Sequence, residues 1–376
     1  MAGLLNFLFG DNTRKAVNEA AWSDNIQVEM EKAVTTRVCD PSGNELILGE
    51  SICEGGEGKI YAIPQYSDFL IKIYHDEIIS NPAKNSKILP RIADMVNMKD
   101  LPAEVAWPMM GIYDTNASSS RRLVGFAMKK MAGRPLRSLH YVAKIEKHFP
   151  GWNRKNLVMV AINFVNAVDQ LHRRNILIND FNPSNFFVDG KGTVRFIDCD
   201  SYQVPGKKCT HYNSVHFNTH CAPELLIHPE LLKHQRAVEH DLFGVAITIF
   251  QILMLGLHPY SRIGGDDPEQ NLRSGMCPLG IGSNCRLPAG TWYNLWSHLP
   301  CRLKSLFIKT FKAGHNNPNE RVSLEEWKFE LNNYLKCINR AFLNPSLRPD
   351  TAKSSDYKGR EENTRNFKNY SGKVTA

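Results

Sequence analysis

A short polar loop in the middle of the chain carries the residues best suited to chemistry. Asp180 and Asn185 stand in a D-x-x-P-x-N pattern, and Asp198 follows a short apolar stretch at 193–197. Carboxylate and amide oxygens on two separate segments are the ligands that Mg²⁺ prefers when it bridges phosphate oxygens. The spacing therefore indicates a phosphoryl-transfer centre, with Asp180 facing the attacking hydroxyl and the other two holding the metal. Taken alone, the pattern also fits an ordinary Asx-Pro turn.

Two earlier features could bind the phosphates of a nucleotide. Gly55, Gly56 and Gly58 form a glycine-rich turn between two predicted strands, where backbone N–H groups can approach phosphates without a Cβ clash. Lys72 follows in an apolar strand, where an unpaired ammonium would be costly to bury. Glycine-rich hairpins are common, and a lysine on an edge strand can reach solvent. Neither feature alone therefore indicates a nucleotide site, but the two together do.

Downstream features could anchor such a centre. Glu224 ends an A-P-E sequence, and Arg321 lies far along the chain in an N-E-R-V sequence. We expect a buried, bidentate ion pair between Glu224 and Arg321 that holds the segment before Glu224 in place. Asp241 precedes a long apolar stretch at 242–257, and this position favours a helix-capping role.

The pattern of apolar residues divides the chain into a sheet-rich first part and a helical second part. Helical periodicity predicts one early helix at 82–98, which Pro90 interrupts or confines to the residues from Arg91 onward. The predicted strands are 45–48, 59–63, 69–74, 107–113 and 123–128. The predicted later helices are 156–172, 242–257, 302–311 and 324–337. We therefore expect an α+β fold.

Composition and charge narrow the class of protein. The 376 residues suit a two-lobed domain, and the nine cysteines, which follow no framework spacing, predict reduced thiols in a cytoplasmic protein. No apolar run approaches the roughly 20 residues of a membrane span. The apolar start, 1–9, lacks the basic region and cleavage site of a signal peptide. The net charge of +8 forms no stripe, so we expect no nucleic-acid partner, and residues 344–376 are predicted to be a disordered basic tail. The oligomeric state is not indicated.

In their order along the chain, these features resemble the eukaryotic-like protein kinase family over roughly residues 45 to 335. The finer motifs are similar to those of bacterial kinases of the YegI type, which resemble the kinases found beside tellurium-resistance genes. Those motifs are A-W-P at 106–108, G-F-A-M at 125–128, D-C-D-S at 198–201 and G-L-H-P at 256–259. The resemblance implies a two-lobed kinase fold with a small β-rich N-lobe at 45–131 and a larger helical C-lobe at 132–335. An N-terminal extension, 1–44, would precede it.

The resemblance also implies a role for each matching residue. Asp180 would be the catalytic aspartate, acting with Lys72, and Asn185 and Asp198 would hold Mg²⁺ or Mn²⁺. Met128 would be the gatekeeper beside the adenine, and 129–131 the hinge. The implied ATP-binding residues are Gly55, Gly56, Gly58, Ile60, Lys72, Met128, Lys129, Met131 and Asn185.

The chain departs from the family's pattern at several positions. Asn179 replaces the arginine that pairs with a phosphorylated activation loop, so we expect an enzyme that such phosphorylation does not switch. Asn182 replaces a lysine at the transferring phosphate, which should slow transfer. No glutamate stands at the usual spacing of about 19 after Lys72, and Asp94 is the best substitute. The other departures are Cys53 for the first glycine, Leu70 for an alanine over the adenine, and Asp200 for the glycine of D-F-G.

The expected function is an ATP-dependent protein kinase that transfers the γ-phosphate to serine or threonine of an unidentified protein substrate and can phosphorylate itself. An ATP-binding pseudokinase scaffold is the main alternative, because it would explain Asn182 and the missing glutamate. A small-molecule phosphotransferase agrees less well with the A-P-E sequence and Arg321. A zinc site is a further alternative, although its spacing matches no zinc module; its ligands would be Cys209, His211, His216, His220 and Cys221.

Overall fold

The structure is a computed structural model that describes residues 37–115, 122–280, 286–288 and 291–349. The chain forms two compact units, and each is considered by itself. The first unit runs to Met98 and includes Trp107–Lys130, and the second comprises Lys99–Ala106 and the residues from Met131 onward. The apolar start and residues 350–376 of the predicted tail lie outside the described residues.

The first unit is built on an antiparallel sheet whose strand order is β2-β1-β6-β7-β5-β4-β3. The strands are β1 (Val38–Cys39), β2 (Glu45–Leu46), β3 (Ser51–Glu54), β4 (Gly58–Ala62), β5 (Phe69–Tyr74), β6 (Met110–Asp114) and β7 (Leu123–Lys129). The predictions for β4, β5 and β7 are confirmed to within a residue or two. β3 was not predicted, because its largely exposed S-I-C-E sequence shows no apolar alternation.

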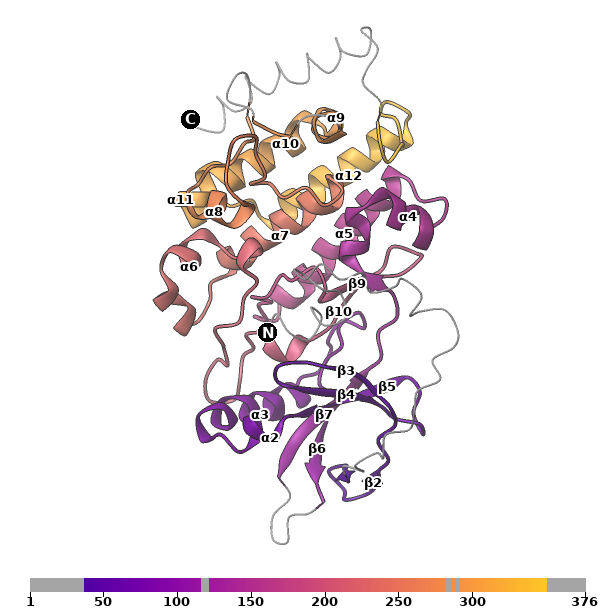
Figure 1. Ribbon diagram of the computed structural model, residues 1–376, viewed down its shortest axis with the longest axis vertical. Coiled ribbons are helices and arrows are strands. Elements are labelled where there is room, and N and C mark those ends of the chain that lie inside the picture. The colour runs from indigo at the N-terminus through magenta and orange to yellow at the C-terminus, as the bar shows by residue number, and fades with distance from the viewer. Residues whose placement is uncertain (1–36, 116–121, 281–285, 289–290, 350–376) are drawn as a thin grey trace. The chain divides into compact units, whose positions relative to one another are not determined.

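One long helix, α3 (Pro82–Val96), accompanies this sheet and contacts β6 (Figure 1). Pro90 lies inside it, so the prediction that Pro90 interrupts or delays the helix is wrong. The helix begins early because the Asn81 side chain accepts hydrogen bonds from the N–H groups of Ala83 and Lys84. Pro90 removes only one backbone donor, and burial of the apolar face offsets that loss. The buried apolar side chains are Ile88, Ile92 and Met95.

The second unit is mainly helical. Helix α5 (Arg154–His172) contacts both α7 (Val238–Leu253) and α12 (Leu324–Asn339) (Figure 1). The apolar stretch predicted at 242–257 forms α7, but the helix ends at Leu253 because Leu255 and Gly256 adopt positive φ. The other helices are α4 (Val142–His148), α6 (Pro223–Ile227), α8 (Pro268–Arg273), α9 (Thr291–His298), α10 (Cys301–Ile308), a π-helical turn (Lys309–Ala313) and α11 (Gly314–Asn316).

A small sheet in the second unit positions the central loops. Its strand order is β10-β9-β8, and its strands are β8 (Arg134–Pro135), β9 (Phe186–Val188) and β10 (Val194–Phe196). The rings of Phe164, Phe181, Phe186 and Phe196 pack together with centroids 5.0–6.5 Å apart. This aromatic cluster fixes α5 against β9 and β10, and so fixes the loops that leave them. Antiparallel strands followed by helices confirm the predicted α+β class.

The first residues of the predicted tail contact the helical unit. Residues 344–349, which the sequence assigns to the tail, contact the helical unit: Pro345 O accepts a hydrogen bond from Arg154 N, and Asn344 O accepts one from His298 Nε2. Within the described residues, no helix combines the length and the apolar character that crossing a bilayer requires.

Candidate active site

The loop between α5 and β9 brings Asp180 and Asn185 into direct contact. Asn185 Nδ2 donates a hydrogen bond to Asp180 Oδ2 at 3.0 Å, and Asp180 is 3% exposed. Burial and, to a smaller extent, the negative charge of Asp198 raise the pKa of Asp180 to about 7, although the hydrogen bond from Asn185 opposes the rise. The loop also contains the Asx turn that the sequence allowed, since Asn182 Oδ1 accepts from Ser184 N at 3.0 Å. The turn and the polar site therefore coexist.

The side-chain oxygens of Asn185 and Asp198 form a donor set that fits a hard cation such as Mg²⁺. Ile197 N donates to Asn185 O at 2.9 Å, which brings Asp198 beside Asn185. Because Asn185 gives its amide nitrogen to Asp180, its Oδ1 is left as an acceptor of the kind that Mg²⁺ prefers. Across the described ranges, no group of three or more His, Cys, Asp or Glu side chains could hold a metal ion. A cation at Asn185 and Asp198 would take its other ligands from phosphates and water.

The zinc alternative does not agree with the geometry. Its five residues form no metal-binding group in the part of the chain that is described. Instead, His220 Nε2 lies 2.8 Å from Gln251 Oε1, and burial lowers the pKa of His220 well below its usual value. Cys221 is also buried, which raises the pKa of its thiol to about 12. His220 and Cys221 are therefore part of the buried core, whereas Cys209 is exposed.

Asp241 holds the loop before Asp180, a role that the sequence did not predict. Its Oδ2 accepts from Ile178 N at 2.7 Å and its Oδ1 accepts from Asn179 N at 3.0 Å, while His172 Nε2 lies 2.9 Å from Oδ2. Asp241 lies inside α7, which begins at Val238, so the predicted capping role is wrong. Its carboxylate fixes a stretch in which Asn179 has a φ of 60°. The only signal in the sequence was a carboxylate beside an otherwise apolar stretch.

Gly244, one turn further along α7, fixes the residue after Asp180. A Cβ on Gly244 would collide with the ring of Phe181, so glycine is required for this close approach. The Phe181 ring in turn packs edge-on against Phe164 of α5 at a centroid distance of 6.5 Å. Asp180 is thus flanked on both sides by backbone that α7 holds in place.

The segment from Asp198 to Glu224 is described throughout and is held by many uncharged contacts. Gln203 pairs with Leu177 through two backbone hydrogen bonds of 2.9 and 3.0 Å. Its side chain forms two more to the backbone of Arg236, with Oε1 accepting from Arg236 N at 2.7 Å and Nε2 donating to Arg236 O at 3.0 Å. Further along, His258 Nε2 donates to Thr219 O at 2.7 Å.

The predicted ion pair between Glu224 and Arg321 is confirmed. Arg321 Nη1 donates to Glu224 Oε1 at 2.8 Å and Nη2 donates to Oε2 at 2.5 Å, so the pair is bidentate. The Arg321 side chain is fully buried, and its guanidinium lies 5.0 Å from the centroid of the Phe243 ring. Arg321 also donates to the carbonyls of Gly314 and Glu239, so four of its five N–H groups have acceptors.

The glycine hairpin in the first unit is held by His75, a residue that the sequence analysis missed. The hairpin closes with a hydrogen bond from Gly55 N to Gly58 O at 2.9 Å. His75 N donates to Glu57 O at 2.9 Å, and His75 Nε2 donates to Gly55 O at 2.7 Å. A lone histidine after a strand gave no signal of this contact in the sequence.

The three glycines of the hairpin differ in their surroundings. A Cβ on Gly58 would collide with the carbonyl of Ile73 in β5, so this glycine is required by strand packing alone. Gly56 is exposed, and a Cβ there would meet nothing within 4 Å. The backbone at Gly56 is therefore open, and no contact within the unit requires glycine there.

Lys72 lies inside the sheet rather than at its edge. Its strand, β5, pairs with β4 on one side and β7 on the other, and the side chain is 2% exposed, so the alternative of a solvent-reaching edge lysine is wrong. Lys72 Nζ lies 5.6 Å from the centroid of the Tyr74 ring. Arg91, which stands 19 residues after Lys72, is 3% exposed on α3.

The structure thus gathers the predicted residues into two groups. The first unit holds Gly55, Gly56, Gly58, Ile60, Lys72, Met128 and Lys129. Ile60 pairs with Lys72 across β4 and β5, and Leu70 pairs with Met128 across β5 and β7. The second unit holds Met131, Asp180, Asn185 and Asp198. The printed contacts join Ile60 to Lys72 in the first unit and Asp180 to Asn185 in the second.

Comparison with known proteins agrees with this arrangement. The protein kinase domain family matches residues 110–330, which is more than half of the chain. Protein kinase YegI of Escherichia coli K12 is 29% identical over 228 residues, covering 60% of this chain and 34% of the relative. Protein kinase YegI of Escherichia coli O157:H7 is 30% identical over 223 residues, covering 59% and 33%. The chain therefore matches about a third of the length of these relatives, and it belongs to the protein kinase domain family.

Proposed function

We propose that the chain is an active protein kinase that transfers the γ-phosphate of Mg-ATP to serine or threonine hydroxyls of a protein substrate. Membership of the family implies the use of ATP. One observation carries the proposal that transfer takes place. Asp180 is buried against Asn185, and its pKa is raised to about 7 by burial and by the charge of Asp198. Perturbed carboxylates gathered with oxygen ligands are typical of catalytic centres.

In the proposed reaction, Asp180 accepts a hydrogen bond from the substrate hydroxyl and orients its oxygen toward the γ-phosphorus. The new oxygen–phosphorus bond forms as the bond to the β–γ bridging oxygen breaks, ADP leaves, and the hydroxyl proton passes to Asp180. Burial makes Asp180 a stronger proton acceptor than an exposed aspartate. Asn185 and Asp198 would hold Mg²⁺, which supplies charge neutralisation at the phosphate oxygens when it is bound.

The first unit would bind the nucleotide. Gly56 and its neighbours would cover the phosphates, and Lys72 would contact them. Ile60, Met128 and Lys129 would line the adenine side together with Met131. We also propose that the kinase domain begins at β1, since Val38 pairs with β6, and that the N-terminal extension precedes it.

We further propose that phosphorylation of the activation segment does not switch this enzyme. Gln203 and Arg236 join the segment to the residues before α7 through two neutral hydrogen bonds, and Glu224 anchors its end. These contacts supply the order that an arginine–phosphate pair would otherwise provide. We expect treatment with a phosphatase to leave kcat unchanged within about twofold. A large fall in kcat after dephosphorylation would contradict this.

A second candidate, an ATP-binding pseudokinase, is favoured by one observation. Arg91, and no glutamate, stands 19 residues after Lys72, the usual spacing of the glutamate in an active kinase, and it is buried. Nucleotide binding without transfer would distinguish this candidate. The bidentate Glu224–Arg321 pair supports a protein kinase over a small-molecule phosphotransferase, because it builds an ordered activation segment.

The experiment that tests the proposal uses ATP labelled at the γ-phosphate. The purified full chain is incubated with generic protein substrates, with free amino alcohols and sugars, and alone. We expect label on protein, with phosphoserine or phosphothreonine after hydrolysis. Label on phosphotyrosine would overturn the residue specificity, and label on small molecules alone would overturn the substrate class. Bound ATP without transfer to any acceptor would support the pseudokinase.

A further inference from the structure

Basic side chains gather on one surface of the second unit, over β8 and α4. Arg134 lies in β8, and Lys144 and Lys147 lie in α4. All three are exposed, and none of them forms an ion pair with a carboxylate of the described residues. Lys144 and Lys147 stand three positions apart, so they are neighbours on one face of the helix. Arg134, Lys144 and Lys147 are called the basic patch below.

One histidine shows that the basic patch is a single cluster. Burial lowers the pKa of the His148 imidazole, and the positive charges of all three members of the patch lower it further. The three cations therefore lie around one ring, and like charges gathered in this way repel one another. Glu146 does not offset them, because it stands two positions from Lys144 and so faces another side of α4. The patch therefore lowers stability unless an anion from outside joins it.

The basic patch lies close to the loop that carries Asp180. In the small sheet, Arg134 pairs with Val188, which comes three residues after Asn185, and Asn185 bonds to Asp180. Consecutive Cα atoms are about 3.8 Å apart and paired ones about 5 Å, so the Cα atoms of Arg134 and Asn185 are at most about 17 Å apart. An extended peptide covers about 3.3 Å per residue. A peptide whose hydroxyl faces Asp180 therefore reaches Arg134 within about five residues.

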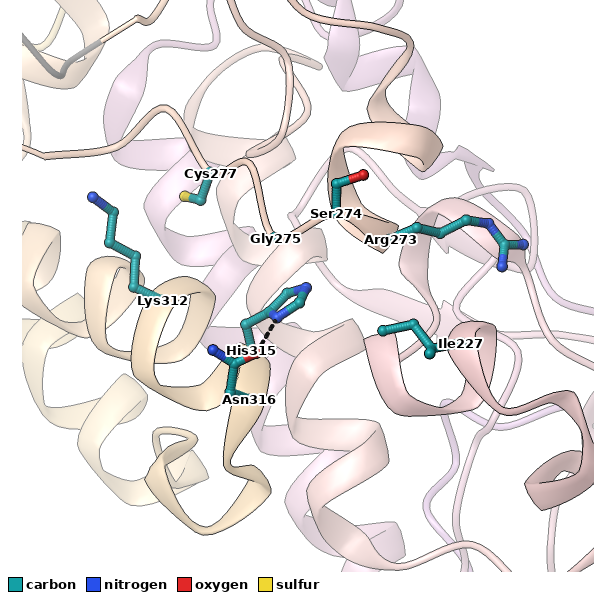
Figure 2. Close-up of a pocket in the computed structure, with 8 residues that line it drawn as sticks. All are labelled: Ile227, Arg273, Ser274, Gly275, Cys277, Lys312, His315 and Asn316. Carbon is teal, nitrogen blue, oxygen red and sulfur yellow. Dashed lines mark hydrogen bonds between the residues drawn. The ribbon is translucent and has the colours of Figure 1, made fainter.

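The cations around a recess elsewhere in the second unit are engaged differently. Figure 2 shows this recess of about 530 Å³, which Arg273, His315 and Lys312 line. Arg273 pairs with Glu269 at 2.7 Å, and the two ring nitrogens of His315 lie 2.7 and 3.0 Å from hydrogen-bond partners. Lys312 is exposed and forms no ion pair with any carboxylate that the structure describes. The recess therefore offers an anion one exposed lysine, whereas the basic patch offers three cations.

The composition of the basic patch matches a run of carboxylates. Tyr141 is 62% exposed beside it, and Lys144 Nζ lies 5.2 Å from the centroid of that ring. Phosphate groups are typically held by arginine forks that converge on one point, whereas lysines bind as separate point charges. Proteins that bind duplex nucleic acid typically neutralise about six to ten phosphates, which three cations do not. A short peptide with several glutamates or aspartates therefore fits the patch better than a phosphopeptide or a duplex.

We propose that the basic patch selects protein substrates that carry several glutamates or aspartates within about five residues of the phosphorylated hydroxyl. The inference rests on the proposed function, because it names the class of substrate that the same site would phosphorylate. Each carboxylate would pair with one cation near solvent, so the preference is a sum of small contributions that salt weakens. The patch would act on substrate binding and would not touch the transferred phosphate.

Peptides with a single serine test the proposal on the full chain. Each carries a block of four glutamates, four alanines or four lysines, placed either before or after the serine. Transfer of labelled phosphate from ATP gives kcat and KM, and fluorescence anisotropy gives the Kd of each peptide. We expect one of the two glutamate peptides to show a KM about tenfold below that of its alanine counterpart, at similar kcat. The difference should shrink as salt is added, and the lysine peptides should be the poorest substrates.

Reversal of two charges in α4 provides the variant. We expect Lys144→Glu combined with Lys147→Glu to remove the preference for glutamate, to improve the lysine peptide, and to leave kcat/KM for the alanine peptide unchanged within about twofold. A matched control reverses two exposed lysines outside the patch, Lys312→Glu with Lys336→Glu, and should keep the preference for glutamate. An exchange of preference from glutamate to lysine is a result that a general loss of structure does not produce.

Each outcome decides the inference. Equal KM values for the glutamate and alanine peptides, or a preference that survives reversal of Lys144 and Lys147, would overturn it and leave the proposed function intact. Tighter binding of a phosphoserine peptide, or loss of duplex DNA binding in the variant without any peptide preference, would overturn the assignment to carboxylates. If no peptide is phosphorylated, the proposed function fails and the Kd values decide: glutamate-specific binding that the variant loses supports the patch, and equal Kd values overturn it.

Discussion

The glycine hairpin of the first unit and the loop around Asp180 in the second unit are stabilised differently. His75 holds the hairpin from a side chain that is 24% exposed, and it contacts two backbone carbonyls. Asp241 holds the other loop from a carboxylate that is 1% exposed, on a helix buried along most of its length. Buried charge-assisted hydrogen bonds are stronger than neutral bonds near solvent. We infer that the loop around Asp180 is preorganised, whereas the hairpin can open.

The largest effect is expected from Asp241→Ala, which tests whether the loop around Asp180 is preorganised. The substitution leaves the N–H groups of Ile178 and Asn179 without an acceptor. We expect the free energy of unfolding to fall by about 3 kcal/mol and kcat to fall about a hundredfold, because Asp180 loses its fixed position. Chemical denaturation and steady-state kinetics measure the two quantities.

A surface carboxylate provides the control for this variant. Asp169 on α5 pairs with Arg173 and Lys328 near solvent. Asp169→Asn should leave kcat unchanged and alter the free energy of unfolding by about 1 kcal/mol or less. An Asp241→Ala variant that loses stability but keeps the kcat of the wild type would show that Asp241 does not position the catalytic loop.

The next effect is the pH dependence of the free energy of unfolding, and it arises from His258 in the second unit. Burial lowers the pKa of His258 from 6.5 to about 4, and its Nδ1 accepts from Tyr260 N at 3.2 Å. The unfolded chain takes up this proton near pH 6.5, whereas the folded chain resists it until about pH 4. The burial of neutral His258 therefore leaves the free energy of unfolding unaffected by pH above pH 6.5. As the pH falls from 6.5 toward 4, the free energy of unfolding decreases by about 3 kcal/mol.

Denaturation with urea at a series of pH values measures this loss. His258→Gln should flatten the dependence, because glutamine can still donate to Thr219 O but cannot take up a proton. Some dependence should persist, because burial also lowers the pKa of His140 to about 4. An unchanged slope in His258→Gln would mean that His258 does not supply it.

The smallest effect is expected from His75→Ala, which tests whether the glycine hairpin can open. The variant removes the hydrogen bond to Gly55 O but keeps the backbone bond to Glu57 O. We expect the KM for ATP to rise about fivefold at nearly unchanged kcat, since the loss of one hydrogen bond loosens the hairpin over the phosphates. His75→Gln should restore part of the affinity because its amide can donate. If His75→Ala instead lowers kcat as strongly as Asp241→Ala, the two regions do not differ as described.

The correct predictions came from residue types in a familiar order along the chain. The D-x-x-P-x-N loop, the buried Lys72 strand and the Glu224–Arg321 pair were recognisable from residue types and order, and the structure confirms the pair and the buried strand. β1 was missed because two residues, Val38 and Cys39, are too short to show a period, and they pair with β6 far along the chain. Such non-local pairing leaves no local pattern.

Tertiary contacts explain the remaining errors. The helix through Pro90 is stabilised by its cap and its buried face, which outweigh a single lost hydrogen bond. Asp241 was taken for a cap because its partners, Ile178 and Asn179, lie more than sixty residues earlier. His75 contacts Gly55 across a hairpin, and nothing in its neighbours predicts the direction of its ring. Side-chain direction depends on packing that a sequence pattern does not encode.

The most direct test of the central claim is the intact mass of the purified chain after incubation with Mg-ATP, compared with Asp180→Asn. The account predicts one or more added masses of about 80 Da, the mass of a phosphate, in the wild type alone, because Asp180 orients the attacking hydroxyl. Asparagine keeps the size of Asp180 and its contact with Asn185 but cannot accept the proton. No added mass in a wild type that is saturated with ATP would contradict self-phosphorylation, and equal added mass in both proteins would contradict the claim that Asp180 orients the attacking hydroxyl.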